Sequence, residues 1–279
     1  AMTGGSPQAK VINNAFSKVA QQTGLAMATG SLSAIFRVPE YNDSFSIVRK
    51  NNPKGLIIAN LSANATVEMA QKAIQLIDAN ALEIHLNVAQ EMVMPEGERS
   101  IHWIDNIQRL VQSLSVPVIV KEVGFGLSKE TIQKLQAIGV QTVNVSGRGG
   151  TNFIQIEDRR NHAHDFNDLY NWGLTTPEAL FESHAVNTIN IIASGGIASP
   201  LDVVKAGVLG AKAVGVAGFF LHQYYKSGED GLLASVHNWQ TEITRIMTML
   251  GCHHFAELPK VPYVLKPELL SYVQQRNLK

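Results

Sequence analysis

Short apolar runs alternate along this chain with longer segments in which apolar residues recur at helical spacing. Seven of the short runs predict buried strands: Leu25–Thr29, Gly55–Asn60, Ala81–Leu86, Val116–Val120, Thr142–Ser146, Asn190–Ser194 and Ala213–Val216. The longer segments predict helices over Gln8–Gln22, Thr66–Ala79, Ile101–Ser113, Lys129–Ile138, Pro177–His184 and Pro200–Ala206. This alternation is typical of βαβ units and of a parallel sheet covered by helices.

The opening residues "AMTGG" have the pattern of the end of an eighth strand. Eight strands predict a single α/β domain over residues 1–279, a (β/α)8 TIM barrel whose first strand is truncated at the N-terminus. A doubly wound open sheet is the alternative. Two stretches break the rhythm: the polar segment 147–173, expected to be a long loop, and the tail after Gly228, expected to be a C-terminal helical extension with a helical run Leu232–Leu250.

Composition narrows the function classes. The chain is 45% apolar and 16% charged, which allows a full core, and its formal net charge is zero, so no basic surface predicts a nucleic-acid partner. There is no apolar run of 18 residues, so we expect no membrane span. The single cysteine, Cys252, fits a reducing compartment, and we expect a cytoplasmic protein. Because the chain begins without an initiator Met, we also expect its natural start to be missing.

Polar or small residues follow every predicted strand. In a barrel, the carboxyl ends of the strands meet at the active-site face, so these residues are expected to lie together. They are Met2 to Gly5, Thr29 to Ser31, Asn60, His85 with Asn87, Lys121, Ser146 with Gly147, Ser194 to Gly196, and Ala217 with Gly218.

Glycine loops follow the last two predicted strands. Gly195 and Gly196 precede a helix start at Ser199, and Gly218 precedes another. Glycine lets backbone N–H groups approach an anion, and a helix N-terminus favours negative charge. The pair therefore predicts a site for a phosphate-bearing ligand, and Ser146 and Thr151 on a third glycine loop are candidate donors to it. Since no G-x-G-x-x-G follows a first strand, we do not expect this ligand to be a dinucleotide.

Lys121 ends an apolar strand and is expected to reach the barrel mouth. There it would face an anionic cofactor or intermediate. A Schiff-base lysine and a lysine that extends to solvent are the alternatives.

Taken together, "AMTGGS", "IHLNVAQE" with "PEGER", "VKEVGFG", "VSGRGGTNF", "ASGGI" and "GVAGFFL" resemble type 2 isopentenyl diphosphate isomerase, over essentially the whole chain and in the expected order. The resemblance implies an FMN-dependent enzyme on a (β/α)8 barrel that interconverts isopentenyl and dimethylallyl diphosphate. It implies reduced flavin, NADPH as reductant and Mg2+. The glycine loops alone would also fit 2-hydroxy acid oxidases and dihydroorotate dehydrogenases.

The resemblance also assigns site residues. It implies that Glu91 binds Mg2+ and that Gln90, His85 and Asn87 contact substrate, with Lys121 near the flavin ring as a further catalytic group. The implied cofactor-binding residues are Met2, Thr3, Ser31, Asn60, Lys121, Ser146, Thr151, Gly195, Gly196, Ile197, Ala217 and Gly218.

Two other functions stay open at this point. One is an FMN oxidoreductase of the 2-hydroxy acid oxidase type, although no Arg follows "ASGGI" as such an oxidase would need. The other is a non-catalytic flavin- or phosphate-binding barrel, because the family carries about sixty further residues before "AMTGG", including cationic groups for the diphosphate. We therefore expect the 279 residues alone to be nearly inactive. We also expect a homo-oligomer, a dimer or a tetramer.

Overall fold

A computed structural model describes residues 6–161 and 165–278. Its seven strands are β1 (Met27–Ser31), β2 (Ile57–Ser62), β3 (Ala81–Leu86), β4 (Val118–Glu122), β5 (Thr142–Asn144), β6 (Asn190–Ala193) and β7 (Ala213–Val214). Its helices are α1 (Pro7–Thr23), α2 (Asn42–Asn51), α3 (Val67–Ile77), α4 (Val88–Val93), α5 (Trp103–Ser113), α6 (Lys129–Ala137), α7 (Phe153–Arg160), α8 (Thr176–His184), α9 (Pro200–Val208), α10 (Gly218–Met249) and α11 (Pro267–Gln275).

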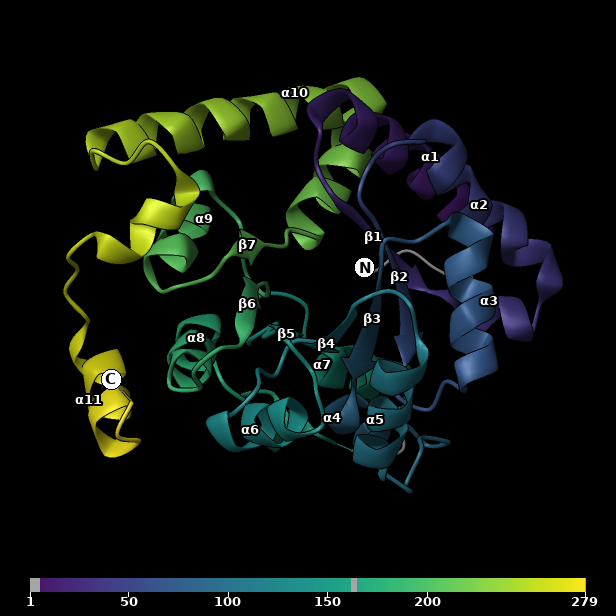
Figure 1. The fold of residues 1–279 in the computed structure, drawn as a ribbon, viewed down its shortest axis with the longest axis horizontal. Coiled ribbons are helices and arrows are strands. Elements are labelled where there is room, and N and C mark those ends of the chain that lie inside the picture. Colours follow the sequence, from purple (N-terminus) through teal and green to yellow (C-terminus); the bar gives the residue numbers. More distant parts are fainter. Residues whose placement is uncertain (1–5, 162–164, 279) are drawn as a thin grey trace.

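The strands form one parallel sheet in the sequential order β1 to β7. Figure 1 shows that the sheet curves, with the helices around its outside. This order excludes the doubly wound alternative for the described strands and is the order of a barrel. The prediction of a (β/α)8 barrel is thus confirmed as far as a seven-stranded, half-barrel α/β sheet. The expected eighth strand falls in residues 1–5, outside the described residues, so closure into a full barrel stays a prediction.

All seven predicted strands are present, with boundaries that differ by at most two residues. The six predicted helices are also present. The expectation that segment 147–173 is a loop is wrong in part, because the segment contains α7. Sequence reasoning also missed α2, α4 and α11. The expected helix in the tail is the second part of α10, which turns sharply at Gly228, where φ is 68° and ψ is −164° (Figure 1).

Hydroxyl side chains cap the N-termini of several of the helices that follow strands. Thr66 accepts a hydrogen bond from the Met69 N–H at the start of α3, and Ser128 accepts one from the Thr131 N–H at the start of α6. Thr175 forms a complete capping box with Glu178 at the start of α8. These caps satisfy backbone donors that have no partner inside the helix. They fix where each helix begins and, with it, the length of the strand-end loops.

The core lies between the sheet and the surrounding helices. Fully buried residues from strands, among them Ile57, Leu82 and Val120, pack with helix residues such as Ile132 and Leu135. Within residues 6–161 and 165–278, no helix combines the length and apolar character needed to cross a membrane.

A buried acid anchors the C-terminal helix. The carboxylate of Glu182 in α8 is fully buried and accepts hydrogen bonds from Arg276 Nε at 2.8 Å, Tyr272 Oη at 2.6 Å and the Lys129 N–H at 2.7 Å. Burial disfavours the charged carboxylate, but the hydrogen bonds from Arg276, Tyr272 and Lys129 outweigh it and hold the pKa of Glu182 below its usual value. The anchor therefore joins α11 to α8 and α6.

We expect Arg276→Met to lower the free energy of unfolding by about 2–4 kcal/mol, because it leaves a buried carboxylate without its cation. Urea unfolding measures this change. Because the pKa of Glu182 is lowered in the folded state, its contribution is present at neutral pH and is lost as pH falls through the folded pKa. Lys10→Met is the control: Lys10 pairs with Asp43 at 3.6 Å, with both side chains more than half exposed, and should change stability by less than about 1 kcal/mol. Equal effects of the two substitutions would contradict the anchor.

Candidate active site

The carboxyl ends of the central strands bring the predicted polar residues to one level of the sheet. In the strand register, Ser62 pairs with His85, His85 with Lys121, and Lys121 with Asn144. Side chains two residues apart on a strand share a face, so Glu83 lies on the same face as His85, one layer deeper. The strand register thus places His85 and Lys121 at one level, with Ser62 and Asn144 beside them.

A chain of hydrogen bonds crosses this deeper layer. Asn60 Nδ2 donates to Glu83 Oε2 at 3.0 Å, and Asn144 Nδ2 donates to Glu83 Oε1 at 3.1 Å. Ser194 Oγ donates to Asn144 Oδ1 at 2.7 Å. All four residues are less than 10% exposed. Strand β4 separates β3 from β5, so the bond between Glu83 and Asn144 spans it, which places these side chains on the concave face of the curved sheet.

His85 lies at the top of this network. Its Nδ1 is 2.9 Å from Asn60 Oδ1. Burial, and then the positive charge of Lys121, lower the pKa of His85 to about 4. Without a ligand, His85 is therefore neutral at physiological pH.

Lys121 and Glu122 are the last two residues of β4 and precede the turn over residues 123–125. Lys121 Nζ donates to the Glu122 carbonyl at 2.6 Å, which places its ammonium beside the strand ends. The Glu122 carboxylate is 7% exposed and accepts the N–H groups of Val123, Gly124 and Phe125. Burial raises the pKa of Glu122 to about 7, against the opposing effect of these N–H donors and of Lys121. The Glu122 carboxylate thus stabilises the turn that follows β4, immediately after Lys121.

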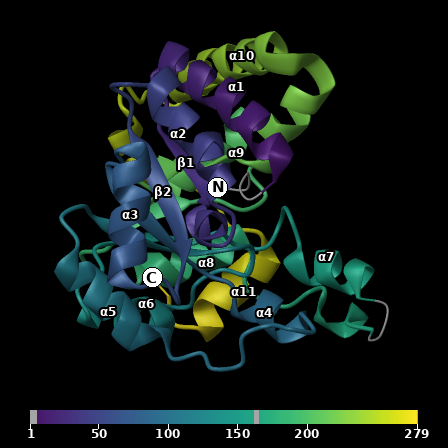
Figure 2. The same cartoon turned by 90° about the vertical axis from the view of Figure 1, so that its right-hand side faces the viewer.

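Three predicted residues lie at short helix α4, with Asn87 at its N-cap and Gln90 and Glu91 inside it. Glu91 accepts hydrogen bonds from Asn87 Nδ2 and from the Glu98 N–H, each at 2.7 Å. Gln90 Nε2 donates to Glu157 Oε1 at 2.8 Å. Glu157 belongs to α7, and Figure 2 shows α7 projecting from the body on the same side as α4. The segment expected to be a loop therefore supplies a buried acid that orients Gln90.

The glycine loops after β5 and β6 pack backbone against backbone. A Cβ on Gly195 would lie 2.0 Å from the Gly147 carbonyl oxygen, and one on Gly196 would lie 2.7 Å from Gly149 C. Gly195 and Gly196 have φ of 92° and 70°, which glycine adopts without strain. At Gly218, by contrast, a Cβ would meet no atom within 4 Å. Gly218 opens α10 after β7, the strand that pairs with β6, so this open space lies at the same end of the sheet as Gly195 and Gly196.

The other predicted cofactor residues are placed as follows. Ser31 pairs in register with Asn60 and accepts a hydrogen bond from the Ser33 N–H. Ser146 is buried at the end of the β5 run, while Thr151, Ile197 and Ala217 are half-exposed on the glycine loops. Met2 and Thr3 lie outside the described residues.

Three acids of this site were missed by sequence reasoning: Glu83, Glu122 and Glu157. A signal for Glu83 exists, since a charged residue inside the apolar run "ALEIHL" shares the face of His85. Glu157 has no comparable signal, because its role depends on a contact between segments 67 residues apart.

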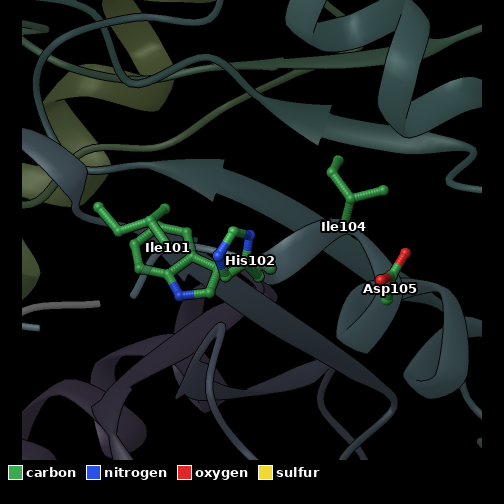
Figure 3. A pocket seen from close by; sticks show the side chains of 5 residues that line it. Ile101, His102, Ile104 and Asp105 are labelled. Carbon is green, nitrogen blue, oxygen red and sulfur yellow. The ribbon is translucent and has the colours of Figure 1, made fainter. Parts of the chain in front are cut away.

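A separate hollow of about 270 Å³ lies at the start of α5, lined by Ile101, His102, Trp103, Ile104 and Asp105 (Figure 3). It contains none of the predicted site residues. Within the described ranges, no three His, Cys, Asp or Glu side chains are grouped to hold a metal ion.

The chain is similar to several curated proteins that share one name. The chain is 57% identical over its whole length to isopentenyl-diphosphate delta-isomerase of Limosilactobacillus reuteri subsp. reuteri (strain JCM 1112), covering 81% of that protein. It is 49% identical over 99% of its length to the enzyme of that name from Latilactobacillus sakei subsp. sakei (strain 23K), covering 80% of it. It is 47% identical over its whole length to the one from Staphylococcus aureus (strain Newman), again covering 80%.

Solved structures share the fold at low identity. A mandelate oxidase with (S)-2-phenylpropionate has a TM-score of 0.65 at 16% identity, over 91% of this chain and 73% of that one. A soluble mutant of (S)-mandelate dehydrogenase from Pseudomonas putida also has 0.65, at 17% identity, over 89% and 74%. Residues 40–264 match the FMN-dependent dehydrogenase family. The chain therefore belongs to the isopentenyl-diphosphate delta-isomerase family of enzymes, within the wider FMN-dependent dehydrogenase family.

Proposed function

We propose that this protein converts isopentenyl diphosphate to dimethylallyl diphosphate at the concave mouth of its sheet, with reduced FMN and Mg2+. The observation that carries the proposal is the identity of 47–57% over the whole chain to relatives of that name. The geometry supports it, because the residues assigned by resemblance gather at the strand ends around Lys121 and His85. A 2-hydroxy acid oxidoreductase is less well supported, because the solved oxidases share only the fold.

The residues at the end of the sheet fit FMN. The paired glycine loops expose backbone near Gly218, where space is open at a helix N-terminus, and a phosphate fits such a place. The ammonium of Lys121 has three donors, one of which is used on the Glu122 carbonyl, so its charge can also serve the flavin ring. Bound and reduced, FMN would supply the group that exchanges the proton with the alkene.

The residues of α4 fit Mg2+. Mg2+ is commonly bound by one or two carboxylates together with substrate phosphates and water. Glu91 is such a carboxylate, and its hydrogen bonds with Asn87 and the Glu98 N–H hold it in one orientation. Gln90 is oriented in turn by Glu157, and neutral His85 adds a polar group without charge. Glu91 and Gln90 would orient the diphosphate and its cation, and the cation would neutralise part of the diphosphate charge.

Three further parts of the proposal follow from the sequence and from the resemblance. They are NADPH as the reductant, a dimeric or tetrameric assembly, and a cytoplasmic location. Met2 and Thr3 keep their proposed contact with the flavin.

The proposal is tested with the protein expressed together with any natural residues that flank this sequence. With FMN bound and reduced and Mg2+ present, we expect isopentenyl diphosphate to be converted to dimethylallyl diphosphate, measured by separation of the two products. Bound, reduced flavin without any conversion would remove the assignment. Turnover of a 2-hydroxy acid by the same sample would support the oxidoreductase instead.

Glu91→Gln tests the metal site. The substitution keeps size and removes the charge, so the Mg2+ concentration for half-maximal activity should rise roughly tenfold or more, while FMN binding survives. The control is Glu96→Gln, which removes an exposed charge on the same segment and should leave the Mg2+ response within about twofold. Loss of flavin together with activity would show that Glu91 has a structural role.

Gly218→Ala tests the phosphate site apart from the fold. A Cβ at Gly218 meets no protein atom, so stability without FMN should stay unchanged. It would narrow the space proposed for the phosphate, and we expect FMN affinity to fall about tenfold or more by flavin fluorescence titration. Gly195→Ala is the comparison, since its Cβ would overlap the Gly147 carbonyl and should destabilise the protein even without FMN. Unchanged FMN affinity in Gly218→Ala would place the phosphate elsewhere.

A further inference from the structure

The Glu83 carboxylate has a specific effect on the amides beside it. Both of its oxygens accept hydrogen bonds, one from Asn60 Nδ2 at 3.0 Å and the other from Asn144 Nδ2 at 3.1 Å. An ionised carboxylate can only accept. If Asn60 were turned over, its Oδ1 would meet Glu83 Oε2, and two buried acceptors would face each other without a proton between them. Glu83 therefore fixes which way the Asn60 amide points.

The orientation of Asn60 passes to His85. Because Nδ2 of Asn60 is turned to Glu83, its Oδ1 faces His85 Nδ1 at 2.9 Å. An amide oxygen can only accept, so Nδ1 must carry the proton of that hydrogen bond. His85 is neutral, since burial and Lys121 lower its pKa to about 4. A neutral imidazole carries one N–H, and Nε2 is then left with a lone pair.

We infer that Glu83 is a positioning residue: through Asn60 it holds His85 as the Nδ1–H tautomer, so that Nε2 can only accept a hydrogen bond from a ligand. Among the described residues, no hydrogen bond engages Nε2 of His85.

The consequence for the ligand rests on the proposed function. The oxygens of an ionised diphosphate are acceptors, so they could bond to Nε2 only if His85 took up a second proton. His85 would instead take a hydrogen bond from a donor, such as a water bound to the cation or an N–H or O–H of the cofactor. While His85 stays neutral, the cationic contacts to the diphosphate come from other groups.

The tautomer is measured by ¹⁵N NMR of the histidine side chains in the protein without substrate, at mildly alkaline pH, with His85 assigned by a His85→Gln spectrum. We expect a protonated Nδ1 and an unprotonated Nε2. In Glu83→Met the Asn60 amide loses the acceptor that orients it, and we expect the Nε2 resonance to shift toward that of a protonated nitrogen. Glu157→Gln is the control, since it alters another buried acid of the site without touching the network, and should leave His85 unchanged.

A double variant keeps the test valid if Glu83→Met does not fold. In Glu83→Gln with Asn60→Asp, the carboxylate is at position 60 instead of position 83, and the amide is at position 83 instead of position 60. The amide introduced at position 83 can then accept from Asn144 and donate to the carboxylate introduced at position 60. That carboxylate can in turn accept from His85 Nδ1–H. We expect this variant to keep the Nδ1–H tautomer.

A protonated Nε2 in the unmodified protein would overturn the inference. So would an unchanged His85 signal in a folded Glu83→Met, or a loss of the Nδ1–H signal in the double variant. None of these readouts depends on turnover of isopentenyl diphosphate, so a failed isomerase assignment would leave them interpretable.

Discussion

The burial of the Glu83 carboxylate inside the curved sheet is the constraint on which the strand ends depend. A charge that is 2% exposed must be compensated by hydrogen bonds, because its desolvation is costly. The compensation comes from Asn60 on β2 and Asn144 on β5, on either side of β3 and β4. Side chains from strands that are not neighbours meet only if the sheet bends toward them. The hydrogen bonds that compensate the buried Glu83 carboxylate therefore depend on the curvature of the half-barrel, and they in turn stabilise that curvature.

The close approach of the β5 and β6 loops is the second constraint on the mouth. Gly147 N–H donates to the Ser194 carbonyl, which continues the strand pairing into the loops. Beyond it, Gly149 and Gly196 touch through their backbones, with no room for a side chain at Gly196. Gly196 is exposed after β6, and Gly218 is exposed at the start of α10, after the neighbouring strand β7. A phosphate site there would be a consequence of how the sheet ends and would need no charged side chain of its own.

The sequence allows the fold to be predicted further than the site. The strands are regular apolar runs, so the prediction for β3 is correct to the residue, whereas that for β1 is shifted by two residues because polar Ser31 continues the strand. Sequence reasoning missed helix α7 because "FIQIEDRR" is mostly polar, and only its packing shows that Ile154 is buried. His85 and Lys121 could be predicted because their place at strand ends determines their place in space. Glu157 could not, since its partner Gln90 is near it only in the folded protein.

The side-chain amides of Gln90 and Asn60 are oriented in the same way, although the two residues lie on different elements. Each carboxamide has its nitrogen turned to a buried glutamate, Glu157 for Gln90 and Glu83 for Asn60. In both residues, the buried carboxylate binds the amide nitrogen, so the amide oxygen points away from the carboxylate. For Asn60 the oxygen is presented to His85, and for Gln90 the oxygen is turned away from Glu157. Helix α7 therefore contributes to the site by supplying the acid that orients Gln90.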